Sequence, residues 1–573
     1  MSEPVGDAPF LWAPDAESVE VERDGARVPC VPSGERWTAP GEWPDGTRYR
    51  FVVDGTAVPD PRARSQPDGV HGASEWLAPD RPEPWSPPGG PPTLERAVID
   101  EVHIGTFSTE GTFLGAIQHL DELVDLGVTH VELMPVAAFD GEVGWGYDGV
   151  CLFAPHPRYG TLSDLRELVS ACHERGLAVL IDVVLNHLGP SGNFLAVSGP
   201  YFTDRYSTPW GDALNLDGPG SDGVRRFLID AALHWLEQVD ADGLRLDAVH
   251  ALFDTSAVPL LEQLADEVRA LGERTGRHRT LVAESDRCDP RIVADPPIGP
   301  GLDAVWSDDL HHALHVALTG EDRGYYADVA SGDLELALAE AQTYQGRWSP
   351  HRRRTVGRSV AGTRSDQYVV SLQNHDQIGN RAAGERLHHL VGVDRTAAAA
   401  ALVLLTPFPV LLFQGEEWAA TTPFPYFSDH DGELGQAIRS GRLEEFAAFG
   451  WPPARVADPQ ARATFDAAVL DRREVDAEPH AGMRSWYRSL IALRRSHPAL
   501  GARPQPGHDR VDRSGALVAV RRGSLGVLAN LGGDPERWPT SIGGEVLLCR
   551  GGVAFGVSDA ELAPGAVVVT DGV

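Results

Sequence analysis

The stretch Ala178-Val-Leu-Ile-Asp-Val-Val184 is an apolar run of strand length, and it sets the pattern for the middle of this chain. Seven similar runs each predict a strand: 97–104, 128–133, 243–247, 280–284, 302–306, 368–372 and 409–413. Helical patterns fill many of the gaps between them. Ser163 is expected to cap a helix over 164–175, which Gly176 ends, and 224–239 is amphipathic. Eight such units favour an α/β fold, a (β/α)8 TIM barrel, over an open doubly wound sheet.

The two ends of the chain differ from this middle part. Residues 1–90 hold short β-rich runs between Gly and Pro turns, and Asp54-Gly55 is a hairpin signal. The proline-rich segment 81–92 marks a linker, and short β runs return after Pro504. We therefore expect an N-terminal β-sandwich over 1–90, a (β/α)8 barrel over 91–502 with inserted loops and a helical extension, and a C-terminal β-sandwich over 503–573.

Two segments do not fit the regular rhythm. The connection 189–223 is too long for a tight turn and predicts an inserted loop region that shapes a cleft. Residues 415–480 are acidic and are predicted to be irregular, and a helical pattern follows over 484–495.

Composition excludes several classes of partner. The net charge of the 573 residues is −34 and the sequence contains no lysine, so nucleic acid and acidic membranes would be repelled. No apolar run is long enough to cross a membrane, and the N-terminus lacks a signal-peptide pattern, so we expect a cytoplasmic protein. The five cysteines are widely spaced, which predicts reduced thiols rather than disulfides or a zinc site.

Three carboxylates follow predicted strands: Asp247, Glu284 and Asp376. Acetal hydrolysis with retention needs a carboxylate nucleophile and a carboxylic general acid, and a third carboxylate can stabilise the cationic transition state. Because side chains alternate along a strand, Arg245 should lie beside Asp247 and keep it ionised. A drier site for Glu284 would leave that residue protonated.

Each of these signals also has an ordinary structural interpretation. Arg245 and Asp247 could form a structural ion pair, and Glu284 could simply be an exposed strand end. The triplet Asn374-His375-Asp376 could be a polar turn, and Trp145-Gly-Tyr-Asp148 a packed loop rather than a sugar-stacking platform. A metal site remains open from composition, but the spacing of the candidate ligands does not favour it.

Taken together, four segments resemble the regions that mark the α-amylase clan of retaining glycoside hydrolases: 182–187, 243–247, Glu284 and 374–376. Further segments are similar to the malto-oligosyltrehalose trehalohydrolase family within that clan: 101–107, 144–149, 186–193, 210–215, 306–315 and 373–381. The N-terminal unit looks like the carbohydrate-binding type of β-sandwich module of that family. One departure is Cys288, where the family pattern has Asn.

The resemblance implies hydrolysis of the α-1,4 bond next to the terminal trehalose of maltooligosyl trehalose. It implies that Asp247 is the nucleophile, Glu284 the general acid and base, and Asp376 the residue that binds sugar hydroxyls. The residues implied to bind the sugar or to support those that do are Tyr147, Asp182, His187, Arg245 and His375. No cofactor or metal is expected, and a maltooligosyl trehalose synthase is the expected functional partner.

Two alternatives stay open at the level of the sequence. An α-glucan branching enzyme would use the same glycosyl-enzyme but pass it to a sugar hydroxyl instead of water. Branching enzymes typically have His-Asp-Glu in the fourth region, whereas this chain has His375-Asp376-Gln377, which favours the hydrolase. A non-catalytic glucan-binding relative would normally have lost at least one of the three carboxylates.

Overall fold

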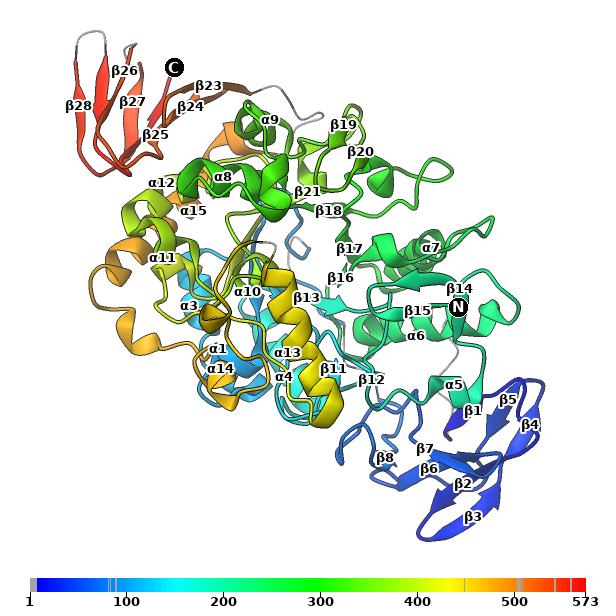
Figure 1. Ribbon diagram of the computed structural model, residues 1–573. Coiled ribbons are helices and arrows are strands. Elements are labelled where there is room, and N and C mark those ends of the chain that lie inside the picture. Colours follow the sequence, from blue (N-terminus) through cyan, green and yellow to red (C-terminus); the bar gives the residue numbers. More distant parts are fainter. Residues whose placement is uncertain are drawn as a thin grey trace.

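The computed structural model describes residues 8–80, 82, 84–87, 90–447, 449–501, 507, 509–539, 543–556 and 559–572. Eight parallel strands close into a barrel in the order β9-β10-β13-β16-β17-β18-β21-β22 (Figure 1). Their bounds are β9 Val98–Val102, β10 His130–Leu133, β13 Ala178–Val183, β16 Gly243–Leu246, β17 Thr280–Ala283, β18 Ala304–Ser307, β21 Tyr368–Ser371 and β22 Val410–Phe413. All eight predicted strands and the barrel are therefore confirmed.

The interior of the barrel has an apolar layer and, nearer the carboxyl ends of the strands, a layer of ionisable side chains. Side chains from six strands or their flanks form an apolar cluster there that includes Ile99, Leu180, Val282, Trp306 and Leu411. Nearer the carboxyl ends of the strands, the buried residues include ionisable ones: Glu101, Glu132, Asp182 and Arg245 are each at most 3% exposed. Burying ionisable groups costs free energy, so a layer of them at this end of the strands indicates the functional end of the barrel.

Helices surround the strands: α2 (Phe113–Ile117), α3 (Leu120–Leu126), α4 (Leu162–Glu174), α6 (Ser221–Gln238), α7 (Leu260–Thr275), α8 (Asp309–Thr319), α9 (Asp333–Glu340), α12 (Val393–Leu404) and α15 (His480–Ser496). The predicted cap of α4 was wrong. Thr161, not Ser163, is the N-cap. Its side chain accepts a hydrogen bond from the backbone N–H of Asp164, and the side chain of Asp164 accepts one from the backbone N–H of Thr161, which completes a capping box. Gly176 follows the helix with a φ of 75°, as a glycine at this position allows.

Two small β units flank the barrel at opposite ends of the molecule (Figure 1). At the N-terminus, β1 (Phe10–Trp12), β5 (Arg36–Thr38) and β4 (Val31–Ser33) form one sheet. The second sheet is β3 (Ala26–Pro29), β2 (Val19–Arg23), β6 (Arg48–Val53) and β7 (Thr56–Val58), and this unit has its own apolar core. Asp54 and Gly55 turn the β6–β7 hairpin, both with positive φ.

The C-terminal unit is also made of two antiparallel sheets. One contains β23 (Arg510–Ser514), β24 (Leu517–Arg522), β25 (Leu525–Asn530), β30 (Val567–Asp571) and β27 (Glu545–Arg550), and the other β26 (Glu536–Trp538), β29 (Ala560–Leu562) and β28 (Val553–Phe555). The predicted boundary at 502–503 and Pro504 lie outside the described residues. In the linker, Trp85 stacks on His173 of α4 with ring centroids 4.2 Å apart, which ties this segment to the barrel.

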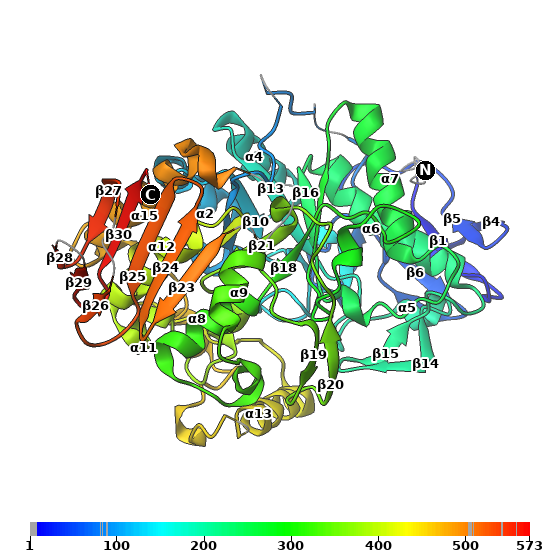
Figure 2. The same ribbon diagram turned by 90° about the horizontal axis from the view of Figure 1, so that it is seen from above.

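Three insertions lie at one end of the barrel (Figure 2). They are the hairpin β14 (Phe202–Thr208)–β15 (Gly211–Leu214), the hairpin β19 (Gln345–Ser349)–β20 (Arg354–Gly357), and helix α13 (Gly432–Ala447). The prediction that 415–480 is irregular was wrong for α13, which has 16 residues. Glycines weaken its sequence signal, but Arg442 ties it to a distant part of the chain by donating to the backbone of Gly379.

Two further expectations concern thiols and membranes. All five cysteines are free. Within the described ranges, no helix combines the length and apolar character needed to span a membrane.

Candidate active site

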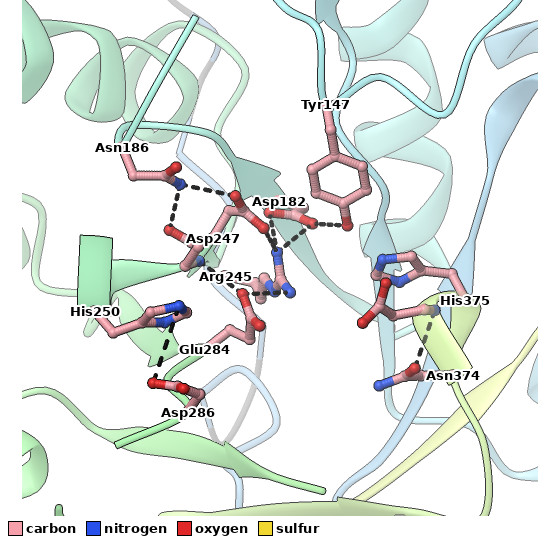
Figure 3. A network of polar contacts seen from close by, with 12 residues as sticks. Tyr147, Asp182, Asn186, Arg245, Asp247, His250, Glu284, Asp286, Asn374 and His375 are labelled. Carbon is pink, nitrogen blue, oxygen red and sulfur yellow. Dashed lines mark hydrogen bonds and ion pairs between the residues drawn. The ribbon is translucent and has the colours of Figure 1, made fainter. Parts of the chain in front are cut away.

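Asp247 follows β16 directly and points into the barrel mouth (Figure 3). Arg245 Nη1 donates to its Oδ1 at 2.7 Å, and the Asn186 amide donates to its Oδ2 at 2.8 Å. Burial by itself would raise the pKa of Asp247, but Arg245, His187 and Asn186 outweigh it, so the pKa lies below its ordinary value. Asp247 is therefore an ionised, oriented carboxylate at neutral pH.

Arg245 is the centre of the network in Figure 3. Its Nη1 also donates to both carboxylate oxygens of Asp182, at 3.0 and 2.9 Å, and Asp182 in turn accepts from the Tyr147 hydroxyl at 2.7 Å. The guanidinium lies 4.4 Å from the Trp306 ring centroid. Arg245 is only 2% exposed, so these partners hold a buried cation in one orientation.

Glu284 follows β17 and approaches the other terminal nitrogen of the same guanidinium, with Oε2 3.2 Å from Arg245 Nη2. The backbone N–H of Ala248 donates to this oxygen at 2.7 Å. Burial, supported by the negative charge of Asp247, raises the pKa of Glu284 to about 8 although Arg245 opposes it. Two carboxyl groups around one guanidinium therefore hold opposite protonation states at neutral pH, as a nucleophile and a general acid require.

The third carboxylate, Asp376, belongs to the short helix α10 (His375–Gly379) after β21. The side chain of Asn374 caps this helix by accepting from the backbone of Asp376 and Gln377. The amide of Asn380 donates to Asp376 Oδ1 at 2.7 Å. The cap and the amide leave Asp376 exposed on the pocket wall in a defined orientation.

A cavity of about 600 Å³ opens above these groups. Seven of the eight residues singled out from the sequence line it: Tyr147, His187, Arg245, Asp247, Glu284, His375 and Asp376. Asp182 lies beneath the floor and reaches the pocket only through Arg245 and Tyr147. This volume accommodates sugar units, and the aromatic and polar lining is of the kind that sugars need.

Aromatic rings stack on two of the three histidines that line the pocket. His187 stacks on Trp210 with ring centroids 4.4 Å apart, and His375 stacks on Tyr147 at 5.2 Å. Burial lowers the pKa of His187, whereas the pKa of His375 is raised because Glu101 and Asp376 outweigh the effect of burial. Burial also lowers the pKa of His250, so among these three lining histidines only His375 has a raised pKa.

The sequence did not single out several residues of the pocket. Trp210 comes from the β14–β15 hairpin, and α13 contributes Leu434, Ile438 and Arg442. Arg442 donates to the backbone of Gly379 and the side chain of Asn380, each at 2.8 Å, and so ties α13 to the loop that carries Asp376. No local pattern marks the residues of α13, whereas Trp210 begins the segment 210–215 that resembles the family, and Asn186 could have been identified from its position beside His187.

A metal centre is not apparent in the part of the chain that the structure describes. No group of three or more His, Cys, Asp or Glu residues has an arrangement suited to an ion there. The acidic groups at the floor instead form ion pairs with Arg245.

Comparison with known proteins gives a consistent picture. Residues 59–206 match the family described as alpha amylase, catalytic domain. The malto-oligosyltrehalose trehalohydrolase of Arthrobacter ramosus is 46% identical, with 98% of each chain covered. A crystal structure of a putative alpha amylase from Salmonella typhimurium has a TM-score of 0.89 and 36% identity, covering 99% of this chain and 98% of the other. A 1,4-alpha-glucan branching enzyme of Pseudoalteromonas atlantica is 38% identical but covers only 27% of this chain and 23% of its own length.

Proposed function

The chain belongs to the malto-oligosyltrehalose trehalohydrolase family, and from this premise we propose how its residues perform the reaction. It is a glycoside hydrolase that cleaves the α-1,4-glucosidic bond next to the terminal trehalose of maltooligosyl trehalose and releases trehalose. The observation that supports the residue roles is the arrangement of Asp247 and Glu284 on the two terminal nitrogens of Arg245.

In the first half of the reaction, Glu284 donates its proton to the glycosidic oxygen and Asp247 attacks the anomeric carbon. The bond to the trehalose oxygen breaks, and a glycosyl-enzyme ester forms on Asp247. Arg245 and Asn186 hold the attacking oxygens in place through hydrogen bonds of 2.7 and 2.8 Å. Glu284 is suited to this role because burial keeps it protonated at neutral pH.

In the second half, Glu284 is a carboxylate and accepts a proton from water. The water attacks the anomeric carbon, Asp247 leaves, and the maltooligosaccharide departs with retained configuration. Asp376 binds hydroxyls of the sugar that carries the developing positive charge, and its exposed carboxylate is free to do so. His187 and His375 donate to the same sugar, and Tyr147 stacks beneath it.

Specificity requires a site that accepts trehalose on the leaving-group side. We assign this role to the loops of 189–223, which supply Trp210 to the pocket wall, and to the segment 306–326, which places Asp308 near Asp376. Burial, followed by the charge of Asp376, raises the pKa of Asp308 to about 7. Asp308 accepts from Gln377 at 2.8 Å, which links the segment to α10.

We assign the domains, the cellular location and the partner enzyme as the sequence predicts them. The unit over 1–90 is a β-sandwich module with a structural role, 91–502 is the catalytic barrel, and 503–573 is a C-terminal β-sandwich. The enzyme acts in the cytoplasm, without a metal or cofactor. A maltooligosyl trehalose synthase supplies its substrate, since the cleaved bond lies beside a trehalose unit that another enzyme must form at the end of a maltodextrin.

Product analysis tests the proposed function. Maltotriosyl trehalose and maltopentaose contain the same number of sugars, so they form a matched pair of substrates. Rapid release of trehalose from the first with slow cleavage of the second is expected. Comparable cleavage of both would instead identify a general amylolytic enzyme. A change in iodine staining without new reducing ends would identify a branching enzyme.

A further inference from the structure

Glu101 is a buried carboxylate that the mechanism above does not use. It lies on β9, inside the barrel, and is 1% exposed. Its two oxygens have different partners, and both partners belong to His375, which is 274 positions away in the sequence. The backbone N–H of His375 donates to Oε2 at 2.9 Å, and the ring Nδ1 makes a short hydrogen bond to Oε1.

These two contacts determine how His375 faces the pocket. The backbone contact anchors the start of α10, and the ring contact sets the orientation of the imidazole against Tyr147. With Nδ1 directed at Glu101, the Nε2 side of the ring is available to a sugar. An imidazole that donates from Nδ1 to a carboxylate and also carries a proton on Nε2 is a charged donor on both sides.

Several other groups face His375 and contribute to its charge. Among them, Asp376 favours the protonated ring, Arg245 disfavours it, and burial disfavours it most strongly. The further titratable or aromatic neighbours from the surrounding elements are Tyr147, Trp145, Trp306, Asp182 and His103. Glu101 is the group with a direct ion pair to the ring, and it therefore has the largest effect of any single neighbour.

We propose that Glu101 is a positioning residue that holds His375 as a doubly protonated, fixed hydrogen-bond donor to the sugar at the cleavage site. This inference rests on the proposed function, because it concerns the same pocket. Glu101 does not touch the substrate and acts only through His375. Its role is a pH-dependent one, since a neutral His375 would make a weaker bond to the sugar than a charged His375.

Glu132 provides a matched control. It lies directly opposite Glu101 on the neighbouring strand β10, and it is equally buried at 1% exposure. Neither of its carboxyl oxygens has a hydrogen-bond partner within the described structure. Burial, supported by the charge of Glu101, raises the pKa of Glu132 well above its ordinary value. The pair thus combines one buried carboxyl group that contacts His375 with one that does not.

The experiment compares Glu101→Gln with Glu132→Gln in the full-length enzyme, using trehalose release from maltotriosyl trehalose at pH 5.5 and pH 7.5. Glutamine keeps the size of the side chain but offers one acceptor oxygen instead of two and carries no charge. Burial then favours neutral His375 at the higher pH. We expect kcat/KM of Glu101→Gln to fall about tenfold or more at pH 7.5, with a clearly smaller deficit at pH 5.5. Glu132→Gln should stay within about twofold at both pH values.

A double-mutant cycle separates positioning from a general structural role. If Glu101 acts through His375, then Glu101→Gln should have little further effect in a His375→Asn background. Equal deficits at both pH values, additive effects in the cycle, or the same profile in Glu132→Gln would overturn the inference. Trehalose release by the wild type is measured in the same assay, so a failure of the proposed function appears there and not in the variants alone.

If Glu101→Gln does not fold, the wild-type enzyme still tests the inference. Nitrogen NMR of histidine-labelled protein, with the signals of His375 identified by their loss in His375→Asn, reports the protonation of both ring nitrogens. A ring that stays doubly protonated above pH 7 supports the role of Glu101. Titration at the ordinary value for histidine, or below it, contradicts it.

Discussion

Replacing Glu284 by Gln is expected to remove both the proton that the leaving group needs and the alkaline limb of the pH profile. Burial in the pocket raises the pKa of Glu284 from 4.5 to about 8, with Asp247 adding to the shift and Arg245 opposing it. Because the general acid must be protonated in the free enzyme, kcat/KM should be high below this pKa and should fall as the pH rises through it.

The structure sets the size of the effect. At pH 7, a carboxyl group with a pKa of about 8 is about 90% protonated, whereas one with a pKa of 4.5 is only about 0.3% protonated. The environment of Glu284 thus increases the active fraction of the enzyme by a factor of about 300. Removing the acid altogether should cost about 10²–10⁴ in kcat/KM on a natural glucan.

The assay compares two kinds of substrate. Maltotriosyl trehalose has a poor leaving group and needs the acid, whereas a maltosyl fluoride carries a leaving group that departs without a proton. Glu284→Gln should therefore lose much less in the first step on the fluoride, and it should accumulate the glycosyl-enzyme. Added azide, which needs no general base, should then accelerate turnover. Asp247→Asn is the control, because without a nucleophile azide has no such intermediate to attack.

Three results would refute this reasoning. Near-wild-type rates of Glu284→Gln on the trehalose substrate would remove it from the role of acid. An unchanged alkaline limb in this variant would assign that limb to another group. Azide rescue of Asp247→Asn but not of Glu284→Gln would exchange the two roles.

Further predictions concern the nucleophile, metal dependence and a helix cap. Asp247→Ala should lower turnover by orders of magnitude while a cooperative melting transition shows that the chain is folded. In a crystal structure of the wild type, the carboxyl groups of Asp247 and Glu284 should lie about 5–5.5 Å apart, as retention requires. Dialysis against a chelator should leave activity unchanged, and restoration of lost activity by calcium would contradict this. Thr161→Ala should cost about 1 kcal/mol in chemical denaturation, whereas Ser163→Ala should cost no more than a few tenths of that; the reverse order would restore the sequence-based cap.

Much of the fold and part of the site could be predicted from short-range patterns. Eight apolar runs, many of them separated by helical patterns, predict the barrel because parallel strands are buried on both faces and need continuous apolar sequence. The contact between Arg245 and Asp247 follows from the alternation of side chains along one strand. The N-cap of α4 could not be predicted from the sequence, because Thr161 and Ser163 are chemically similar and only the backbone conformation distinguishes them.

The sequence alone determined the barrel, the three carboxylates at its strand ends and the family resemblance, because these depend on periodicity and on local motifs. Only the tertiary structure decided which groups meet across the pocket: Glu101 with His375, Asn186 with Asp247, and Arg442 of α13 with Asn380. It also decided the opposite protonation of Asp247 and Glu284. Burial and the shared guanidinium of Arg245 arise from chain closure, which brings distant segments together and which no local pattern encodes.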